Sequence, residues 1–210
     1  MIHKQIQEKG ILAKLLEKGI KILLKKECKK IGNVKINIAA SSIQIIKGII
    51  KKIDIEAEDI NYKDLLFDKI ELEANDINII IKLHNKELNF KNNFSIKFKI
   101  SLSENSLKKI LLSNNWNWIG TRISKEIFNQ DTLEDISIRN DQIIIKTSND
   151  QRNSNKAGNV SIKEEKGKLY IESKESSKYI KIPIEDKVFI ENVNIKNNLI
   201  NIHAKSSVGL

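Results

Sequence analysis

The side chains best suited to catalysis or metal binding are scattered along this sequence. The histidines are His3, His84 and His203, and no two stand four residues apart, the spacing that brings metal ligands together on a helix. The single cysteine, Cys28, has no histidine near it in sequence. Because a nucleophilic thiol needs a base beside it, we expect Cys28 to be a small, partly buried apolar side chain. The sequence therefore predicts no metal centre and no cysteine nucleophile.

Carboxylates could supply an acid–base pair, but their spacing indicates another role. Asp54, Glu56 and Glu58 alternate with apolar residues, and so do Glu71 and Glu73. This period of two places the acids on the solvent side of strands. The chain also lacks the Gly-x-Ser-x-Gly, His-Glu-x-x-His, phosphate-loop and dinucleotide-binding motifs. We expect a protein that is not an enzyme and needs no cofactor.

Positive charge is concentrated at the start of the chain. Residues 1–52 hold 13 lysines against three glutamates, which accounts for the whole net charge of +10. The remaining residues are balanced, so the lysine-rich composition alone does not explain this asymmetry. A basic segment fits an anionic partner such as a membrane surface, a nucleic acid or an acidic protein. The candidate contact residues are Lys25, Lys26, Lys29 and Lys30, where the lysines are densest.

The basic segment has the pattern of an amphipathic helix over residues 1–32. Apolar residues recur at helical spacing on one wide face, with lysines on the opposite face. Gly32 and Asn33 are typical of a helix end. The candidate apolar contact residues on this helix are Leu12, Leu16, Ile20, Leu23, Leu24 and Ile31.

After the helix the period changes to two, which predicts strands with one short helix over residues 33–102. Helical spacing returns as two short helices over residues 103–129, and antiparallel strands follow over residues 130–205. Two-residue turns are expected at Asn140-Asp141 and at Asn197-Asn198. The pattern predicts a single α+β domain over residues 1–210, with the long helix packed along an antiparallel sheet.

The only tryptophans, Trp116 and Trp118, lie in a polar break between the two short helices. Residues two apart face opposite ways in an extended chain. We expect one indole to fill the core and the other to lie at a membrane interface, where indoles are favoured.

The order of elements resembles the LmeA-like phospholipid-binding family. The resemblance covers roughly residues 12 to 204. It depends on the short Ser-rich helix that ends at Gly48, on the segment from Ile60 to Leu66 where the family's chain dips, and on the helix start Leu102-Ser103-Glu104. It implies a fold similar to the tubular lipid-binding proteins, in which a curved antiparallel sheet wraps a long helix and leaves an apolar groove for acyl chains. It implies no catalytic residues.

These observations favour a non-enzymatic protein that binds a phospholipid or similar amphiphile between helix and sheet and meets anionic membranes through its lysines. A nucleic-acid-binding module is an alternative, weakened by the scarcity of arginine and aromatic residues. A scaffold that docks on an acidic protein is another. With neither a signal peptide nor a transmembrane segment visible, we expect a cytoplasmic or peripheral membrane location.

Overall fold

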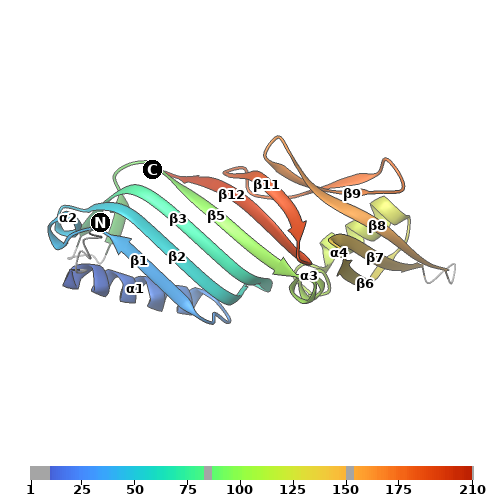
Figure 1. The fold of residues 1–210 in the computed structure, drawn as a ribbon, viewed down its shortest axis with the longest axis horizontal. Coiled ribbons are helices and arrows are strands. Elements are labelled where there is room, and N and C mark those ends of the chain that lie inside the picture. Colours follow the sequence, from blue (N-terminus) through green and yellow to red (C-terminus); the bar gives the residue numbers. More distant parts are fainter. Residues whose placement is uncertain (1–9, 83–86, 150–153, 210) are drawn as a thin grey trace, which may run out of the picture.

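A computed structural model describes residues 10–82, 87–149 and 154–209, and these residues form two antiparallel sheets end to end in an elongated molecule (Figure 1). The first sheet has the strand order β1-β2-β3-β5-β12-β11, with β4 beside β3. Its strands are β1 (Val34–Ala39), β2 (Ile49–Tyr62), β3 (Leu65–Lys82), β4 (Glu87–Phe90), β5 (Phe94–Ser103), β11 (Val188–Lys196) and β12 (Leu199–Val208).

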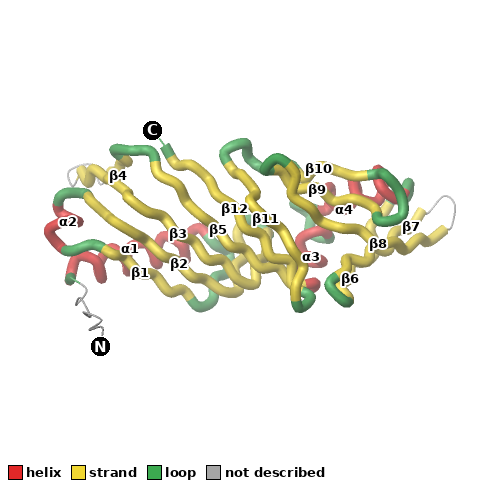
Figure 2. The backbone as a smooth tube through the Cα atoms, turned by 45° about the horizontal axis from the view of Figure 1, so that its top comes forward, coloured by secondary structure: helices red, strands yellow, loops and turns green. Residues whose placement is uncertain are grey.

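The second sheet has the order β10-β9-β8-β7-β6. Its strands are β6 (Thr132–Arg139), β7 (Gln142–Asn149), β8 (Ser154–Glu165), β9 (Lys168–Ser173) and β10 (Tyr179–Ile182). The helical segments are α1 (Ile11–Glu27), α2 (Ser42–Ile46), α3 (Glu104–Leu111), α4 (Asn117–Arg122) and the π-helical η1 (Ile123–Phe128). Figure 2 shows α1 behind the strands of the first sheet, and α3 and α4 where the two sheets meet.

The predicted α+β class and antiparallel pairing are confirmed, but the single long sheet is wrong. Strands β6 to β10 form a sheet of their own, and the chain then returns so that β12 pairs with β5. Helices α3, α4 and η1 intervene between β5 and β6, and their apolar side chains need cover from both sides. The second sheet provides it, because one hydrophobic cluster includes Leu102 and Ile200 of the first sheet and Ile136 and Ile145 of the second.

The long N-terminal helix is shorter than predicted. Of the expected span, residues 1–9 lie outside the described residues, and α1 ends at Glu27, where Cys28 adopts an extended conformation. Beyond it, backbone pairing with β2 replaces helix: Lys30 bridges Asn61, and the Gly32 N–H donates to the Glu58 carbonyl at 2.9 Å. Tertiary pairing therefore overrides local helix propensity after residue 27.

Tight turns join neighbouring strands where two consecutive residues adopt positive φ, as the right-handed twist of hairpins requires. The predicted turns Asn140-Asp141 and Asn197-Asn198 are both of this kind. So is Lys63-Asp64, with φ of 51° and 66°, where the sequence predicted only an irregular dip. The segment from Ile60 to Leu66 is therefore a hairpin tip between β2 and β3.

Candidate functional site

One face of the first sheet, here called the inner face, is apolar across its six principal strands. Strand register aligns the side chains into cross-strand rows, since alternate residues point to the same side. One row is Ile36, Ile55, Leu72, Phe98, Ala204 and Ile190. A second row is Val34, Ala57, Ile70, Ile100, Ile202 and Val193. Sequence alternation in each strand produces this face.

Helix α1 lies against the β1 side of the inner face. Ala13 is fully buried, and Leu16 and Ile20 pack on the cluster around Ile38. The Glu17 carboxylate accepts a hydrogen bond from the Ile38 N–H at 3.0 Å, which ties the helix to the edge strand. The helix therefore forms one wall of a trough, and the sheet forms its floor.

A cavity of about 290 Å³, here called the inner cavity, remains between α1 and the sheet. Its lining is Leu16, Ile20, Ile50, Ile53, Ile55, Leu72, Ala74, Ile77, Ile79, Phe90, Phe94 and Ile96. Every lining residue is apolar, so the cavity offers no hydrogen-bond partner to water or to a polar ligand. Space of this kind suits a hydrocarbon chain.

A second apolar cavity, here called the junction cavity, has a volume of about 150 Å³ and lies where the two sheets meet. Leu102, Ile200 and Ile202 of the inner face line it, together with apolar residues of α3, η1 and the second sheet. Between the two cavities the inner face carries Ile70 and Ile100, both half-buried. An unbroken apolar track therefore runs along the strands from one cavity to the other.

The helix residues predicted to contact a ligand divide into three groups. Leu16 and Ile20 line the inner cavity, and Leu12 beside them is half-buried. Leu24 and Ile31 pack instead on the small cluster of Val34, Ala57 and Ile60, so they are core residues outside the cavity. Leu23 does not line the cavity: its side chain is 60% exposed, because it lies at the border of the face that meets the sheet.

Most of the cavity lining comes from strands, which the sequence reasoning did not assign to the site. The alternation in residues 33–102 predicts these strands, and it places Ile53, Ile55, Leu72 and Ile96 on the apolar side of their own strands. These residues are up to 43 positions apart in the sequence. The pairing of β2 with β3 and of β3 with β5 brings them together. The missing signal was the pairing of strands.

Of the predicted basic residues and tryptophans, Lys29 and Trp116 contact the β2–β3 hairpin tip. Lys25, Lys26, Lys29 and Lys30 are exposed, and the Lys29 ammonium lies 2.7 Å from an oxygen of Asp64. The Trp116 indole N–H donates to the Lys63 carbonyl at 2.9 Å, and its ring packs against the main hydrophobic cluster. Trp118 is 38% exposed. One indole is thus half-buried on the core and the other meets solvent.

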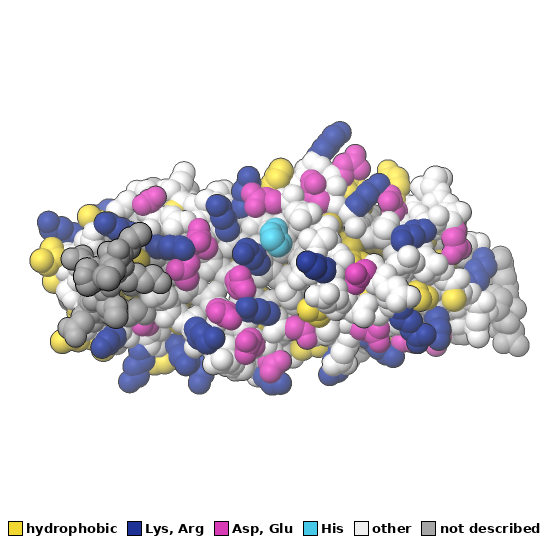
Figure 3. Space-filling model, in the orientation of Figure 1, with side chains coloured by type: hydrophobic (Ala, Val, Ile, Leu, Met, Phe, Trp, Pro, Cys, Tyr) yellow, Lys and Arg dark blue, Asp and Glu magenta, His cyan; other side chains and the backbone are white. Residues whose placement is uncertain are grey.

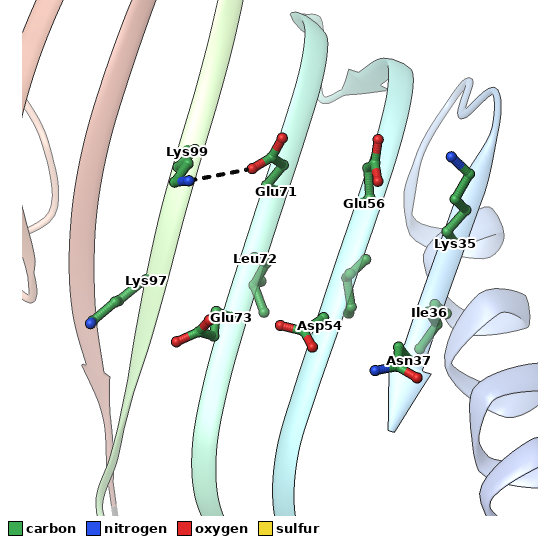
Figure 4. Close-up of a pocket in the computed structure, with 11 residues that line it drawn as sticks. Lys35, Ile36, Asn37, Asp54, Glu56, Glu71, Leu72, Glu73, Lys97 and Lys99 are labelled. Atoms are coloured by element: carbon green, nitrogen blue, oxygen red, sulfur yellow. Dashed lines mark ion pairs between the residues drawn. The ribbon is translucent and has the colours of Figure 1, made fainter. Parts of the chain in front are cut away.

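The opposite face of the first sheet, here called the outer face, is covered by paired charges. Figure 4 shows carboxylates and lysines on this side, with Ile36 and Leu72 pointing away from it. Register places Glu56 directly opposite Glu71, and Asp54 opposite Glu73. Lysines bridge both like-charged pairs: Lys69 contacts Glu56 and Glu71 at 3.0 and 2.7 Å, and Lys52 contacts Asp54 and Glu73 at 2.9 and 2.8 Å.

These ion pairs shift the titration of their members. The hydrogen bond from Lys69 lowers the pKa of Glu71, and the hydrogen bond from Lys52 lowers the pKa of Glu73. The same two hydrogen bonds raise the pKa of Lys69 and of Lys52 above the ordinary value of 10.5. All four groups are therefore charged at neutral pH. Asp54, Glu56, Glu71 and Glu73 occupy the solvent side of their strands, as the alternation predicted, and each has a lysine partner.

Within the part of the chain that the structure describes, reactive side chains are not gathered into a centre. Among the described residues, no group of three or more histidine, cysteine, aspartate or glutamate side chains could hold a metal ion. His203 lies on the outer face, in register with Lys99, whereas His3 and His84 lie outside the described residues. Cys28 packs against the cluster of Val34 and Ala57, and burial raises the pKa of its thiol.

Comparison with protein-family models, with curated proteins and with solved structures found no match. Over the described residues, no helix combines the length and the apolar character that crossing a membrane requires.

Proposed function

We propose that this protein is a non-enzymatic binder of a phospholipid or similar amphiphile, whose hydrocarbon chain lies in the trough between α1 and the inner face. The observation that carries the proposal is the inner cavity, about 290 Å³ in volume and lined by apolar residues of both helix and sheet. Its volume is near the lower end of the range of about 300–1,000 Å³ for ligand pockets. It holds part of a long chain, and the half-buried residues of the track accommodate the rest.

Hydrocarbon burial supplies the binding free energy in this proposal. Each methylene removed from water contributes about 0.8 kcal/mol, so a segment of several methylenes offsets the cost of immobilising the ligand. Lys25 and Lys26 lie in the last turn of α1, and Lys29 and Lys30 follow the helix. All four lysines are exposed and attract an anionic head group. Exposed Trp118 is favoured at a bilayer interface.

The experiment measures lipid capture. Delipidated protein is mixed with phospholipid vesicles, separated from them, and analysed by native mass spectrometry and by lipid extraction. Ile96→Trp places an indole in the inner cavity at a half-buried position, and we expect it to lower the amount of lipid carried. Tyr179→Trp is the matched control, because Tyr179 is 61% exposed on the second sheet.

Circular dichroism establishes that both variants are folded. Wild-type protein that captures no lipid from any vesicle would contradict the proposal. Equal capture by the wild type and by folded Ile96→Trp would show that the inner cavity is not the site.

A further inference from the structure

The side of α1 that faces away from the sheet carries a second apolar surface. Ile11, Leu15 and Ile22 are 77%, 59% and 58% exposed. At 100° per residue these three positions fall within about 40° of one another around the helix axis. Leu23, 60% exposed, lies about 80° further around the helix, beside Leu16. The stripe of Ile11, Leu15 and Ile22, here called the outer stripe, is distinct from Leu16 and Ile20, which line the inner cavity.

A row of lysines follows one border of the outer stripe. Lys14, Lys18, Lys21 and Lys25 are all exposed and lie within about 60° of one another around the helix. An apolar stripe with a lysine row beside it is the pattern of a helix that lies in the plane of a bilayer interface. Figure 3 shows lysines with hydrophobic side chains between them along the edge where α1 runs.

Helix α2 extends this surface at the end of the molecule. Its side chains Ile43 and Ile46 are 67% and 76% exposed. A capping box fixes the helix: the Ser41 hydroxyl accepts from the Gln44 backbone N–H at 3.2 Å, and the Gln44 side-chain Oε1 accepts from the Ser41 backbone N–H at 2.8 Å. Contact between α1 and α2 holds the two exposed apolar groups together. Their exposure is therefore a property of ordered structure.

Charge identifies the occupant. A second copy of this chain packed on the outer stripe would bring one lysine row beside another, and like charges repel. Anionic phospholipid head groups complement the row, while the interface beneath them accepts isoleucine and leucine side chains. We propose that the outer stripe of α1, with Ile43 and Ile46 of α2, docks this protein on anionic bilayers, with the row of Lys14, Lys18, Lys21 and Lys25 against the head groups.

The inference deepens the membrane contact within the proposed function and assigns it to residues other than the lipid trough. The experiment is flotation of the full chain with vesicles of phosphatidylcholine, alone or mixed with phosphatidylglycerol. Leu15→Asp combined with Ile22→Asp places two charges on the stripe at exposed positions, where folding tolerates them. Because each apolar side chain loses its burial in the interface, we expect binding to the mixed vesicles to weaken by about tenfold or more.

A lysine variant tests the electrostatic part. Lys14, Lys18, Lys21 and Lys25 are all changed to Gln, and we expect the preference for the anionic vesicles and the salt dependence of binding to disappear. Tyr179→Asp is the matched control, since it also places an aspartate at an exposed apolar position, but on the second sheet. It should float as the wild type does.

Three results would overturn the inference. The double aspartate variant could float as the wild type does, the wild type could fail to float with either vesicle, or sedimentation without lipid could show a wild-type dimer that the double variant dissociates. The trough proposal has a separate readout. If the docking surface is correct and the trough is not, the wild type floats with anionic vesicles but carries no captured lipid. If the trough is correct and the docking surface is not, the wild type and the double aspartate variant capture equal amounts of detergent-solubilised lipid.

Discussion

Gly48 carries the sharpest backbone constraint among the residues that shape the trough. Its φ is +74°, a value that side chains with a Cβ atom rarely adopt. A Cβ built on it would lie 2.0 Å from the Ile79 carbonyl oxygen, and the Gly48 carbonyl accepts the Ile79 N–H at 2.8 Å. The residue thus lets the chain enter β2 in close contact with β3, beside Ile50 and Ile79 of the inner cavity.

We predict that Gly48→Ala lowers the free energy of unfolding by about 2 kcal/mol or more, because the methyl group meets backbone that cannot rotate away and φ is strained. Gly19→Ala is the comparison. Gly19 lies within α1, has nothing within 4 Å of its would-be Cβ, and should gain up to about 1 kcal/mol. Urea denaturation measures both changes. Equal stability of the two variants would remove the special role of Gly48.

Residue types indicated local roles well and spatial partners poorly. Asn140 and Asp141 could be assigned to a turn because these residue types tolerate positive φ. The turn at Lys63-Asp64 was missed because lysine rarely adopts the left-handed conformation. Leu23 was placed on the buried face because helical spacing identifies a wide apolar face of the helix. That spacing does not determine which residues at the border of this face the sheet covers.

At the scale of elements, the docking of α1 on β1 includes a partly buried hydrogen bond as well as apolar packing. β1 is an edge strand of the first sheet, and its outward N–H and C=O groups have no further strand beside them in the described order. Glu17 satisfies one of them, the Ile38 N–H, at 3.0 Å. Ile38 itself is only 2% exposed. A helix that covers an edge strand also blocks pairing with other chains.

We predict that Glu17→Ala lowers the free energy of unfolding by about 1–3 kcal/mol, because it leaves the N–H of the buried Ile38 without its acceptor. Glu17→Gln keeps an acceptor oxygen and should restore most of that loss. Lys18→Ala, at the exposed neighbouring position, should change stability by less than about 0.5 kcal/mol. Chemical denaturation followed by circular dichroism measures all three, and a Gln variant no better than Ala would argue against the hydrogen bond.

Strands could be predicted where alternation was clean, as in Phe94–Ser103, because a half-buried face imposes a period of two. The end of α1 could not be predicted in this way, because it is set by the pairing of Lys30 with Asn61, which is 31 positions away in the sequence. The division into two sheets was equally hidden. Alternation in residues 130–205 predicts strands, but the residues of β10 and β11 themselves do not indicate which of the two sheets each strand joins.

At the scale of the whole molecule, the two sheets share one hydrophobic cluster. Ile145 on the second sheet and Ile200 on the first are 0% and 1% exposed, and both belong to it. The turns of two hairpins also join the sheets: the Asp141 carboxylate accepts from the Asn198 N–H at 2.8 Å, and the Asn198 side-chain oxygen accepts from the Asp141 N–H at 3.3 Å. These contacts couple the sheets energetically.

We predict one cooperative unfolding transition for the whole chain. Ile145→Ala and Ile200→Ala should each lower the free energy of unfolding by about 2–5 kcal/mol, and each should shift the same single transition, because the cavity forms in a core that both sheets use. Calorimetry together with tryptophan fluorescence tests this, since Trp116 packs on the shared cluster. Two transitions, each sensitive to one variant alone, would establish two independent domains.

The place of β5 in the first sheet has a consequence for biosynthesis. Ser103 at the end of β5 pairs with Leu199 at the start of β12, so the ribosome adds 95 residues between the two partners. At about 5–20 residues per second, roughly 5–20 s pass during which β5 is the unpaired margin of a half-built sheet. Phe94 and Phe98 are open to contact during that interval. Until β12 is made and pairs with β5, that margin is the place where the incomplete sheet is open to pairing with another chain.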